Sequence, residues 1–336
     1  GSVQWRATVS RDTPWLLHTN KCDAAGGPPI CVIMHEATLL SDEQRALLVA
    51  ALSDDGATVL DAWQSWRRHS DLDTLPGDQF PLLPKLYANL ARFGLIAGDS
   101  GDAGRLKGIY RRAWVRTQQQ LALAETLLPP LTATGIPAAL IGDAAAALDL
   151  YPVRGERTIE RLTCLIDDST LATALDVLRG VGWQLEGNPA PLTNPALRRW
   201  LSAAHFQRAG QPGISLCWRL TPTGPALSRT PAISARCIDH TVAPPRVSRA
   251  CQALLAGAQA AQGGPARLIA AADLGIALRV LTPGEWDALL AAAARFQLAR
   301  PFAAALGAVA PLLEVTPPPQ VTARLDALGA GESRYA

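Results

Sequence analysis

The stretch of the sequence with the clearest chemical potential is "YPVRGERTIERLTCLIDD", residues 151–168. Three arginines, Arg154, Arg157 and Arg161, lead into an apolar run that predicts a strand over 159–166. A guanidinium stays charged at any physiological pH and can bind a phosphate or a carboxylate through two parallel hydrogen bonds. Two alternatives follow: the arginines bind an anion, or they pair internally. The acidic residues considered for internal pairing with Arg161 are Glu156, Asp143 and Asp167.

The segments around this stretch predict a small α/β core over residues 132–225. The run "GIPAALIG" is apolar and bounded by glycine, which indicates a buried strand, and "DAAAALDLY" indicates a short helix after it. The backbone amides after Gly142 would open that helix and could hold part of an anion. Further strands are expected at "WQLE", "HFQRA" and "GISLCWRL", and a helix capped by serine at "STLATALDVLRGVG". Strands and helices in this order predict a mixed sheet.

Helices are expected on both sides of the core. Residues 41–131 read as an N-terminal helical region, which opens with a capping box of Ser41 and Gln44 and closes with a long helix over 103–131 that ends near Pro129-Pro130. Residues 246–330 read as a C-terminal helical domain, after a proline-rich segment at 221–245. Residues 1–40 read as an irregular extension. The predicted fold class is α/β, in the looser sense of α+β, with a small mixed-sheet core between helical regions.

Taken in order, these motifs resemble the uncharacterised nucleotidyltransferase family of bacteria, within the polymerase-beta-like nucleotidyltransferase superfamily, over roughly residues 40–315. The resemblance implies a nucleotidyltransferase-fold core. In that family the first strand ends in Leu-Lys-Gly, and here Gly142 is kept while Ile141 replaces the lysine. The next family motif is Arg-Pro-x-Ser-Asp-x-Asp, and of this motif Arg157 is kept. The replaced positions are Arg161 and Thr163 for the two aspartates, Ser215 for the third carboxylate, and a residue near Gln259 for a family histidine.

These replacements bear directly on the metal chemistry that the resemblance implies. Nucleotidyl transfer uses two Mg²⁺ ions, which prefer carboxylate ligands, and two aspartates at i and i+2 of a strand point to the same face. Arg161 puts a positive charge where a cation would bind, which costs roughly 4 kcal/mol per pair of unit charges at close range and an effective dielectric near 20. We therefore expect no catalytic residue, no metal site and no cofactor.

The expected role is that of a binding or accessory component, a pseudoenzyme, in a biosynthetic or peptide-maturation system. The candidate residues for an anion or nucleotide are Gly142, Asp143, Arg157 and Arg161. The alternative is an active nucleotidyltransferase with a relocated Mg²⁺ site. The carboxylates considered for that site are Asp143, Glu156, Glu160, Asp167 and Asp168.

The composition and net charge of the chain limit the classes of partner that we expect. The chain has 336 residues, 49% of them hydrophobic, and a net charge of only +2, so a general attraction to nucleic acid is not expected. No long uncharged apolar run predicts a membrane span. The six cysteines are scattered, without a zinc or disulfide pattern, which favours a cytoplasmic protein. The five histidines are isolated, which is typical of surface or locally hydrogen-bonded residues and not of metal ligands. We expect a protein or peptide partner, with a nucleotide or another anion as the alternative, and an exposed apolar patch on the helical part, because the chain holds nine tryptophans.

Overall fold

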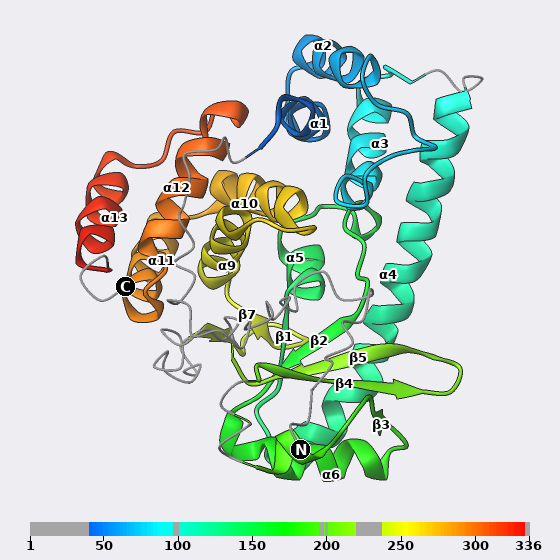
Figure 1. Cartoon of the computed structure of the whole chain (residues 1–336), viewed down its shortest axis with the longest axis vertical. Helices are drawn as coiled ribbons and strands as arrows, with labels where there is room; N and C mark the ends of the chain where they lie inside the picture. Colours follow the sequence, from blue (N-terminus) through cyan, green and yellow to red (C-terminus); the bar gives the residue numbers. More distant parts are fainter. Residues whose placement is uncertain (1–39, 97–100, 195–197, 199–200, 220–236, 333–336) are drawn as a thin grey trace, which may run out of the picture.

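The computed structural model of the chain describes residues 40–96, 101–194, 198, 201–219 and 237–332. A mixed seven-stranded sheet lies low in Figure 1, and helices surround it. The strand order is β3-β4-β5-β2-β1-β7-β6. The strands are β1 (Ala139–Ile141), β2 (Leu162–Leu165), β3 (Gln184–Leu185), β4 (Ala203–Arg208), β5 (Gln211–Cys217), β6 (Ile238–Asp239) and β7 (Arg246–Val247). β2 is antiparallel to β1 and parallel to β5, and β4 is antiparallel to β5. The predicted α/β class and mixed sheet are confirmed.

Helices precede and follow the sheet in the chain, as expected. The N-terminal ones are α1 (Asp42–Leu52), α2 (Gly56–Arg67), α3 (Leu83–Arg92) and α4 (Gly101–Ala133). Within the sheet region lie α5 (Asp143–Asp149), α6 (Leu171–Gly180) and α7 (Ala190–Thr193), and after it α9 (Arg249–Gln262), α10 (Arg267–Val280), α11 (Pro283–Phe296), α12 (Ala299–Val309) and α13 (Pro319–Glu332). The 3-10 turns are η1 (Phe80–Leu82), η2 (Arg154–Glu156), η3 (Asp168–Thr170) and η6 (Pro311–Leu313). The capping box of Ser41 and Gln44 is present. The predictions for residues 1–39 and 220–236 lie outside the described residues.

Two of the helix boundaries differ from the sequence prediction. α4 does not end at Pro129-Pro130 but continues to Ala133. Leu127, Leu128 and Leu131 are buried in the core, and this packing keeps the last turn helical despite the two missing backbone donors. The helix after β2 is preceded by η3, and its turn is capped by the carboxylate of Asp167, not by a serine.

The strand predicted over 159–166 is shorter than expected, since β2 begins at Leu162. The residues before it are held by side chains of α4 in place of a neighbouring strand. Gln120 donates to the Glu160 carbonyl at 3.2 Å and accepts from the Leu162 amide at 3.2 Å. Arg161 therefore lies immediately before the strand.

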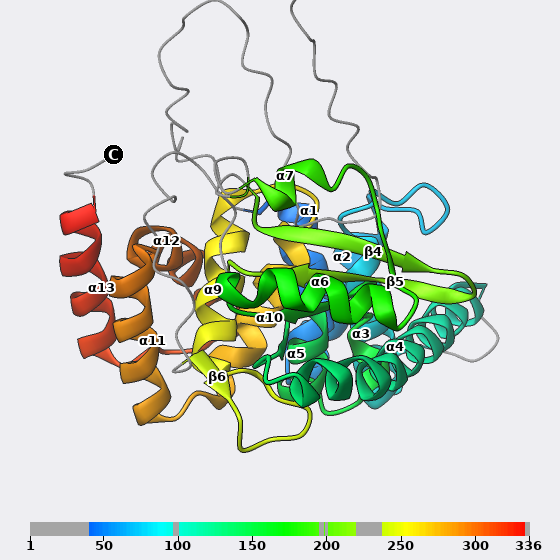
Figure 2. The ribbon, with the colours of Figure 1, turned by 90° about the horizontal axis from the view of Figure 1, so that it is seen from below.

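The two faces of the sheet pack against different helices. Leu140, Leu162 and Leu216 belong to an apolar cluster with α4 and α6, whereas Ile141, Leu165 and Cys217 belong to a second cluster with the C-terminal helices. Strand side chains alternate between faces, so neighbouring residues divide in this way. Figure 2 shows α6 beside β4 and β5, and in Figure 1 it lies on the side of the sheet away from α9 and α10. Cys164 and Cys217 are buried free thiols that pack as small apolar groups, as predicted.

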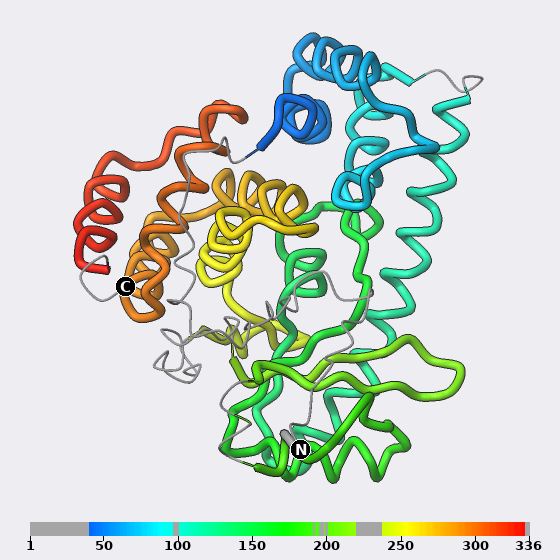
Figure 3. Tube along the Cα trace, viewed as in Figure 1, coloured from blue at the N-terminus to red at the C-terminus, as the bar shows by residue number. Residues whose placement is uncertain are grey.

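The N-terminal and C-terminal helical regions share one apolar cluster. Leu47, Leu86 and Leu90 of the first region and Leu274 and Val309 of the second are all members of it. A hydrogen bond of 2.7 Å from Arg279 Nη1 to the carbonyl of Leu52 joins α10 to the end of α1. The chain trace in Figure 3 shows these helices side by side above the sheet. Within the described ranges, no helix combines the length and apolar character that crossing a bilayer requires.

Candidate functional site

Residues 154–161, which contain the three arginines, pack against α4, and this helix holds them in place. Gly155 lies so close to Trp114 that a Cβ atom at this glycine would stand 2.8 Å from the indole Cδ1. Further along, Thr117 Oγ1 donates to the Arg157 carbonyl at 3.0 Å, and Arg116 Nη2 donates to the Glu160 carbonyl at 3.0 Å. These contacts fix the backbone on both sides of Arg157, so its side chain points into the protein away from α4.

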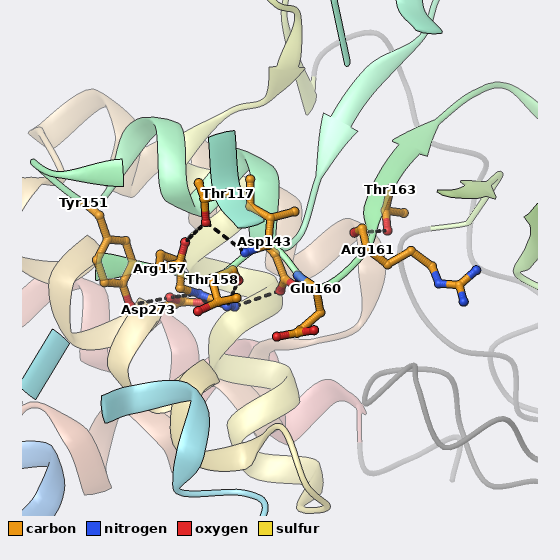
Figure 4. A network of polar contacts seen from close by, with 10 residues as sticks. Thr117, Asp143, Tyr151, Arg157, Thr158, Glu160, Arg161, Thr163 and Asp273 are labelled. Carbon is orange, nitrogen blue, oxygen red and sulfur yellow. Dashed lines mark hydrogen bonds and ion pairs between the residues drawn. The ribbon is translucent and has the colours of Figure 1, made fainter. Parts of the chain in front are cut away.

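Arg157 is the centre of a buried polar network, which Figure 4 shows from close by. Its guanidinium faces the carboxylate of Asp273 on α10, with Nε 3.0 Å from Oδ1 and Nη2 3.0 Å from Oδ2. Nη2 also donates to Asp143 Oδ1 at 2.9 Å, and Nη1 to the Thr158 carbonyl at 3.0 Å. The hydroxyl of Tyr151 donates to Asp273 Oδ1 at 2.7 Å. Arg157 thus joins α5 and α10 to the turn that leads from α5 to β2.

Burial and charge oppose one another in this network, and at Asp273 burial outweighs the positive charge of Arg157, so the pKa of Asp273 is raised. Burial disfavours the charged guanidinium, but the carboxylates of Asp273 and Asp143 more than offset it, so the pKa of Arg157 is raised. Burial, followed by the negative charge of Asp273, raises the pKa of Tyr151 well above its usual value. At neutral pH the site therefore contains a charged arginine and a neutral tyrosine whose hydroxyl donates a hydrogen bond to Asp273.

The three replaced carboxylate positions lie apart from this network. Figure 4 shows the Arg161 side chain directed away from Asp143 and Asp273. Thr163 on β2 is directly opposite Ser215 on β5, and both are buried. The strand register therefore brings these two positions together, as the resemblance implies for the metal ligands.

Arg161, next to Thr163 and Ser215, forms an internal ion pair, but its partner is not one of the expected carboxylates. Its Nη1 lies 3.1 Å from Oε1 of Glu186, just after β3, and 3.4 Å from the Ile214 carbonyl. Gly213 leaves the necessary room, since a Cβ atom there would stand 2.9 Å from Arg161 Nη1. The prediction that Arg161 pairs with Glu156, Asp143 or Asp167 is wrong, because each of these carboxylates is held by a nearer group.

Ser215 is bonded to a histidine that the sequence left as an isolated residue. His205 on β4 is the antiparallel partner of Ser215 in the sheet, and its Nδ1 lies 2.8 Å from Ser215 Oγ. Burial, and after it the positive charge of Arg161, lowers the pKa of His205 from 6.5 to about 4. The imidazole is therefore neutral at pH 7 and adds no charge to that of Arg161.

The carboxylates considered for a relocated metal site each have another partner. Glu156 pairs with Lys85 at 2.9 Å, Glu160 with Arg116 at 2.8 Å, and Asp168 with Arg198 at 3.2 Å. Asp167 accepts from the Ser169 amide at 2.8 Å, and Asp143 is bound to Arg157. Across the part of the chain that the structure describes, no group of three or more histidine, cysteine or acidic side chains is arranged to hold a metal ion.

The predicted anion-binding residues are only partly brought together. Gly142 and Asp143 open α5 next to Arg157, whereas Arg161 points elsewhere. Gly142 has φ 66°, a conformation that favours glycine, which explains this residue type after β1. An anion at Arg157 would have to compete with two carboxylates, and the four residues stay a prediction as an anion site.

Sequence reasoning missed Asp273 and Glu186. Asp273 carried a usable signal, because it is the only acidic residue in the helix "RLIAAADLGIALRV" and is flanked there by apolar residues. An acid that a helix buries needs a basic partner, and the buried arginine of the family motif was available. Glu186 carried no comparable signal, since its contact with Arg161 depends on the register of β3 and β4.

Comparison with known proteins gives one informative result. No curated protein and no solved structure matches the chain. The sequence profile of a family described as uncharacterised nucleotidyltransferase matches residues 81–314, which include β1, the Arg157 turn, β2, β5 and the helix that carries Asp273. The chain therefore belongs to the uncharacterised nucleotidyltransferase family.

Proposed function

We propose that this nucleotidyltransferase-family protein has lost metal-dependent nucleotidyl transfer and acts in the cytoplasm as a binding component of a biosynthetic or peptide-maturation system. The observation that supports this most directly is the ion pair of Arg161 with Glu186, beside the hydrogen-bonded pair of Ser215 and His205. By the resemblance, Arg161 and Ser215 stand at positions where the family motif has metal-binding carboxylates. Arg161 neutralises the carboxylate of Glu186, and the hydroxyl of Ser215 is bound to His205, so this arrangement disfavours a bound cation.

Electrostatics supports the same proposal over the alternative of a relocated Mg²⁺ site. A new site would need at least two carboxylates that converge without a competing cation. Asp143 and Asp273 do converge, but the guanidinium of Arg157 lies between them. An arginine cannot be deprotonated to release them, so a metal ion would have to displace a buried and bidentate ion pair.

The proposal predicts that the purified protein does not transfer nucleotides. Incubated with Mg²⁺ or Mn²⁺ and each common nucleoside triphosphate, it should release no pyrophosphate above the level of a heat-inactivated sample. Metal-dependent release above that level would contradict the proposal. If release were seen, Asp143→Asn would test whether Asp143 is a ligand of the relocated site.

A gain-of-function variant tests the assignment of the replaced positions. Arg161→Asp, Thr163→Asp and Ser215→Asp together restore three carboxylates, and the variant should bind Mn²⁺ in calorimetry where the natural chain does not. The matched control changes the same three residues to Ala, which removes the arginine without adding ligands. A folded triple-Asp variant that binds no more Mn²⁺ than the triple-Ala control would show that these positions do not form the family's metal site.

A further inference from the structure

The outward face of α4 is an unusually basic surface for a chain whose charges are nearly balanced. Between Asp102 and Glu125 the helix contains no acidic residue, and it holds five basic ones: Arg105, Lys107, Arg111, Arg112 and Arg116. Figure 1 shows α4 along one side of the molecule, next to α3 and the sheet but with its other side uncovered by any drawn helix.

Ion pairing divides these basic residues into two groups. Arg105 pairs with Asp73 at 3.0 Å, and Arg116 pairs with Glu160 at 2.8 Å. Within the described part of the chain, Lys107, Arg111 and Arg112 have no ion pair. Arg111 and Arg112 line a shallow hollow of about 370 Å³. Its other lining residues are Val115, Arg116 and Gln119, so no acidic residue lines the hollow.

Exposed apolar side chains lie among the unpaired cations. Trp114 is 47% exposed and Val115 49%, whereas Trp66, Trp183, Trp218 and Trp286 are buried. Trp114 packs on Gly155 of η2, which places the neighbouring Val153, 43% exposed, and Arg154 beside the helix. We call this surface the α4 face. It comprises Lys107, Arg111, Arg112, Trp114, Val115, Val153 and Arg154.

We propose that the α4 face binds an acidic amphipathic segment of a partner protein. The unpaired guanidinium groups fit carboxylates, and the exposed side chains of Trp114, Val115 and Val153 fit apolar side chains of the same segment. Arginine and tryptophan are enriched among the residues that dominate protein interfaces. A nucleic acid would use the cations but not the exposed valines, so the composition of the surface favours a peptide. The inference rests on the binding role proposed above and gives that role a partner class and a location.

The experiment uses the whole chain and three defined probes: a random copolymer of glutamate and tyrosine, poly-glutamate without tyrosine, and a single-stranded deoxythymidine 20-mer. Binding is followed by fluorescence anisotropy of the labelled probe at low and at physiological salt. The test variants are Arg111→Glu with Arg112→Glu, and Val115→Ser with Val153→Ser. The matched control is Arg179→Glu with Arg324→Glu, which reverses the charge at two exposed positions on α6 and α13.

We expect the copolymer to bind, and to bind more tightly than poly-glutamate. The double arginine variant should weaken copolymer binding by roughly 10-fold or more, and the double valine variant by about 3-fold, since both charge and apolar contact contribute. The control variant should bind as the natural chain does. All the changed side chains are exposed, and an unchanged melting temperature would show that each variant is folded.

Three outcomes would overturn the inference: no copolymer binding even at low salt, equal binding by the control and the double arginine variant, or tighter binding of the oligonucleotide than of the copolymer. The last would assign the surface to nucleic acid. These results are independent of the pyrophosphate assay. A chain that transfers nucleotides yet binds the copolymer through Arg111 and Arg112 would refute the proposed loss of activity and leave the binding surface standing.

Discussion

At the scale of single residues, Arg157 is the centre of a buried network of charged and polar groups. Arg157 is buried and engages Asp273 through two parallel hydrogen bonds and Asp143 through a third. A buried ion pair contributes less than its Coulomb energy suggests, because desolvation opposes it, but the loss of one partner leaves an uncompensated charge. The network is therefore a point where single substitutions should have large effects.

Asp273→Asn should lower the free energy of unfolding by about 3 kcal/mol, because Arg157 loses the negative charge of its main partner. The measurement is urea unfolding followed by circular dichroism. Arg179→Gln is the control, since the Arg179–Asp176 pair is exposed and its loss should cost less than about 1 kcal/mol. A change in Asp273→Asn no larger than that of the control would show that the network contributes little to stability.

His205 should make the protein less stable at mildly acidic pH. Its pKa falls from 6.5 to about 4 on folding, so as the pH drops through 6.5 the unfolded state takes up a proton that the folded state does not. The free energy of unfolding should fall by on the order of 2 kcal/mol between pH 6.5 and pH 4 through this group. Urea unfolding at pH 7 and pH 4.5 should show a smaller difference for His205→Gln than for the natural chain. His240→Gln, at an exposed position, should leave the difference unchanged.

At the scale of elements, α4 and the segment beneath it form one unit. Thr117, Gln120 and Arg116 hold the backbone of the segment, and Trp114 covers Gly155. These contacts explain why β2 starts later than the apolar pattern indicates. The residues before Leu162 form hydrogen bonds with side chains of a helix and not with a neighbouring strand. No local sequence pattern predicts this arrangement.

Gly155→Ala tests how closely the two pieces are packed. The added methyl would stand 2.8 Å from Trp114 Cδ1 and 2.9 Å from its Cβ, so the helix or the turn must shift, at a cost of about 1–3 kcal/mol. Gly108→Ala in the same helix has no atom within 4 Å and should stabilise by roughly 0.5–1 kcal/mol. Thermal melts of the two variants should move in opposite directions, and equal shifts would mean that the turn is loosely packed.

At the scale of the whole molecule, local patterns predicted the elements well and their partners poorly. The helices α1, α4, α5 and α9 to α12 and the strands β1 and β5 follow from apolar periodicity and caps. The contact of Arg157 with Asp273 joins residues far apart in sequence, and the contact of Arg161 with Glu186 joins residues at the ends of two separate strands. Their geometry is set by sheet register and helix packing, which no single segment encodes. β6 and β7, two residues each, were too short to leave a pattern.

The length of α4 has a consequence for how this protein can be divided. Its first half packs with α3 and η2, while Leu121, Leu123, Ala124, Leu127, Leu128 and Leu131 of its second half cover the sheet. A cut at residue 131, the predicted boundary between the N-terminal helical region and the core, would remove these leucines from the sheet. Apolar side chains would then be exposed to water on both fragments. Engineers who want to transplant the sheet region, and recombination events that would reshuffle it, must therefore carry this helix along.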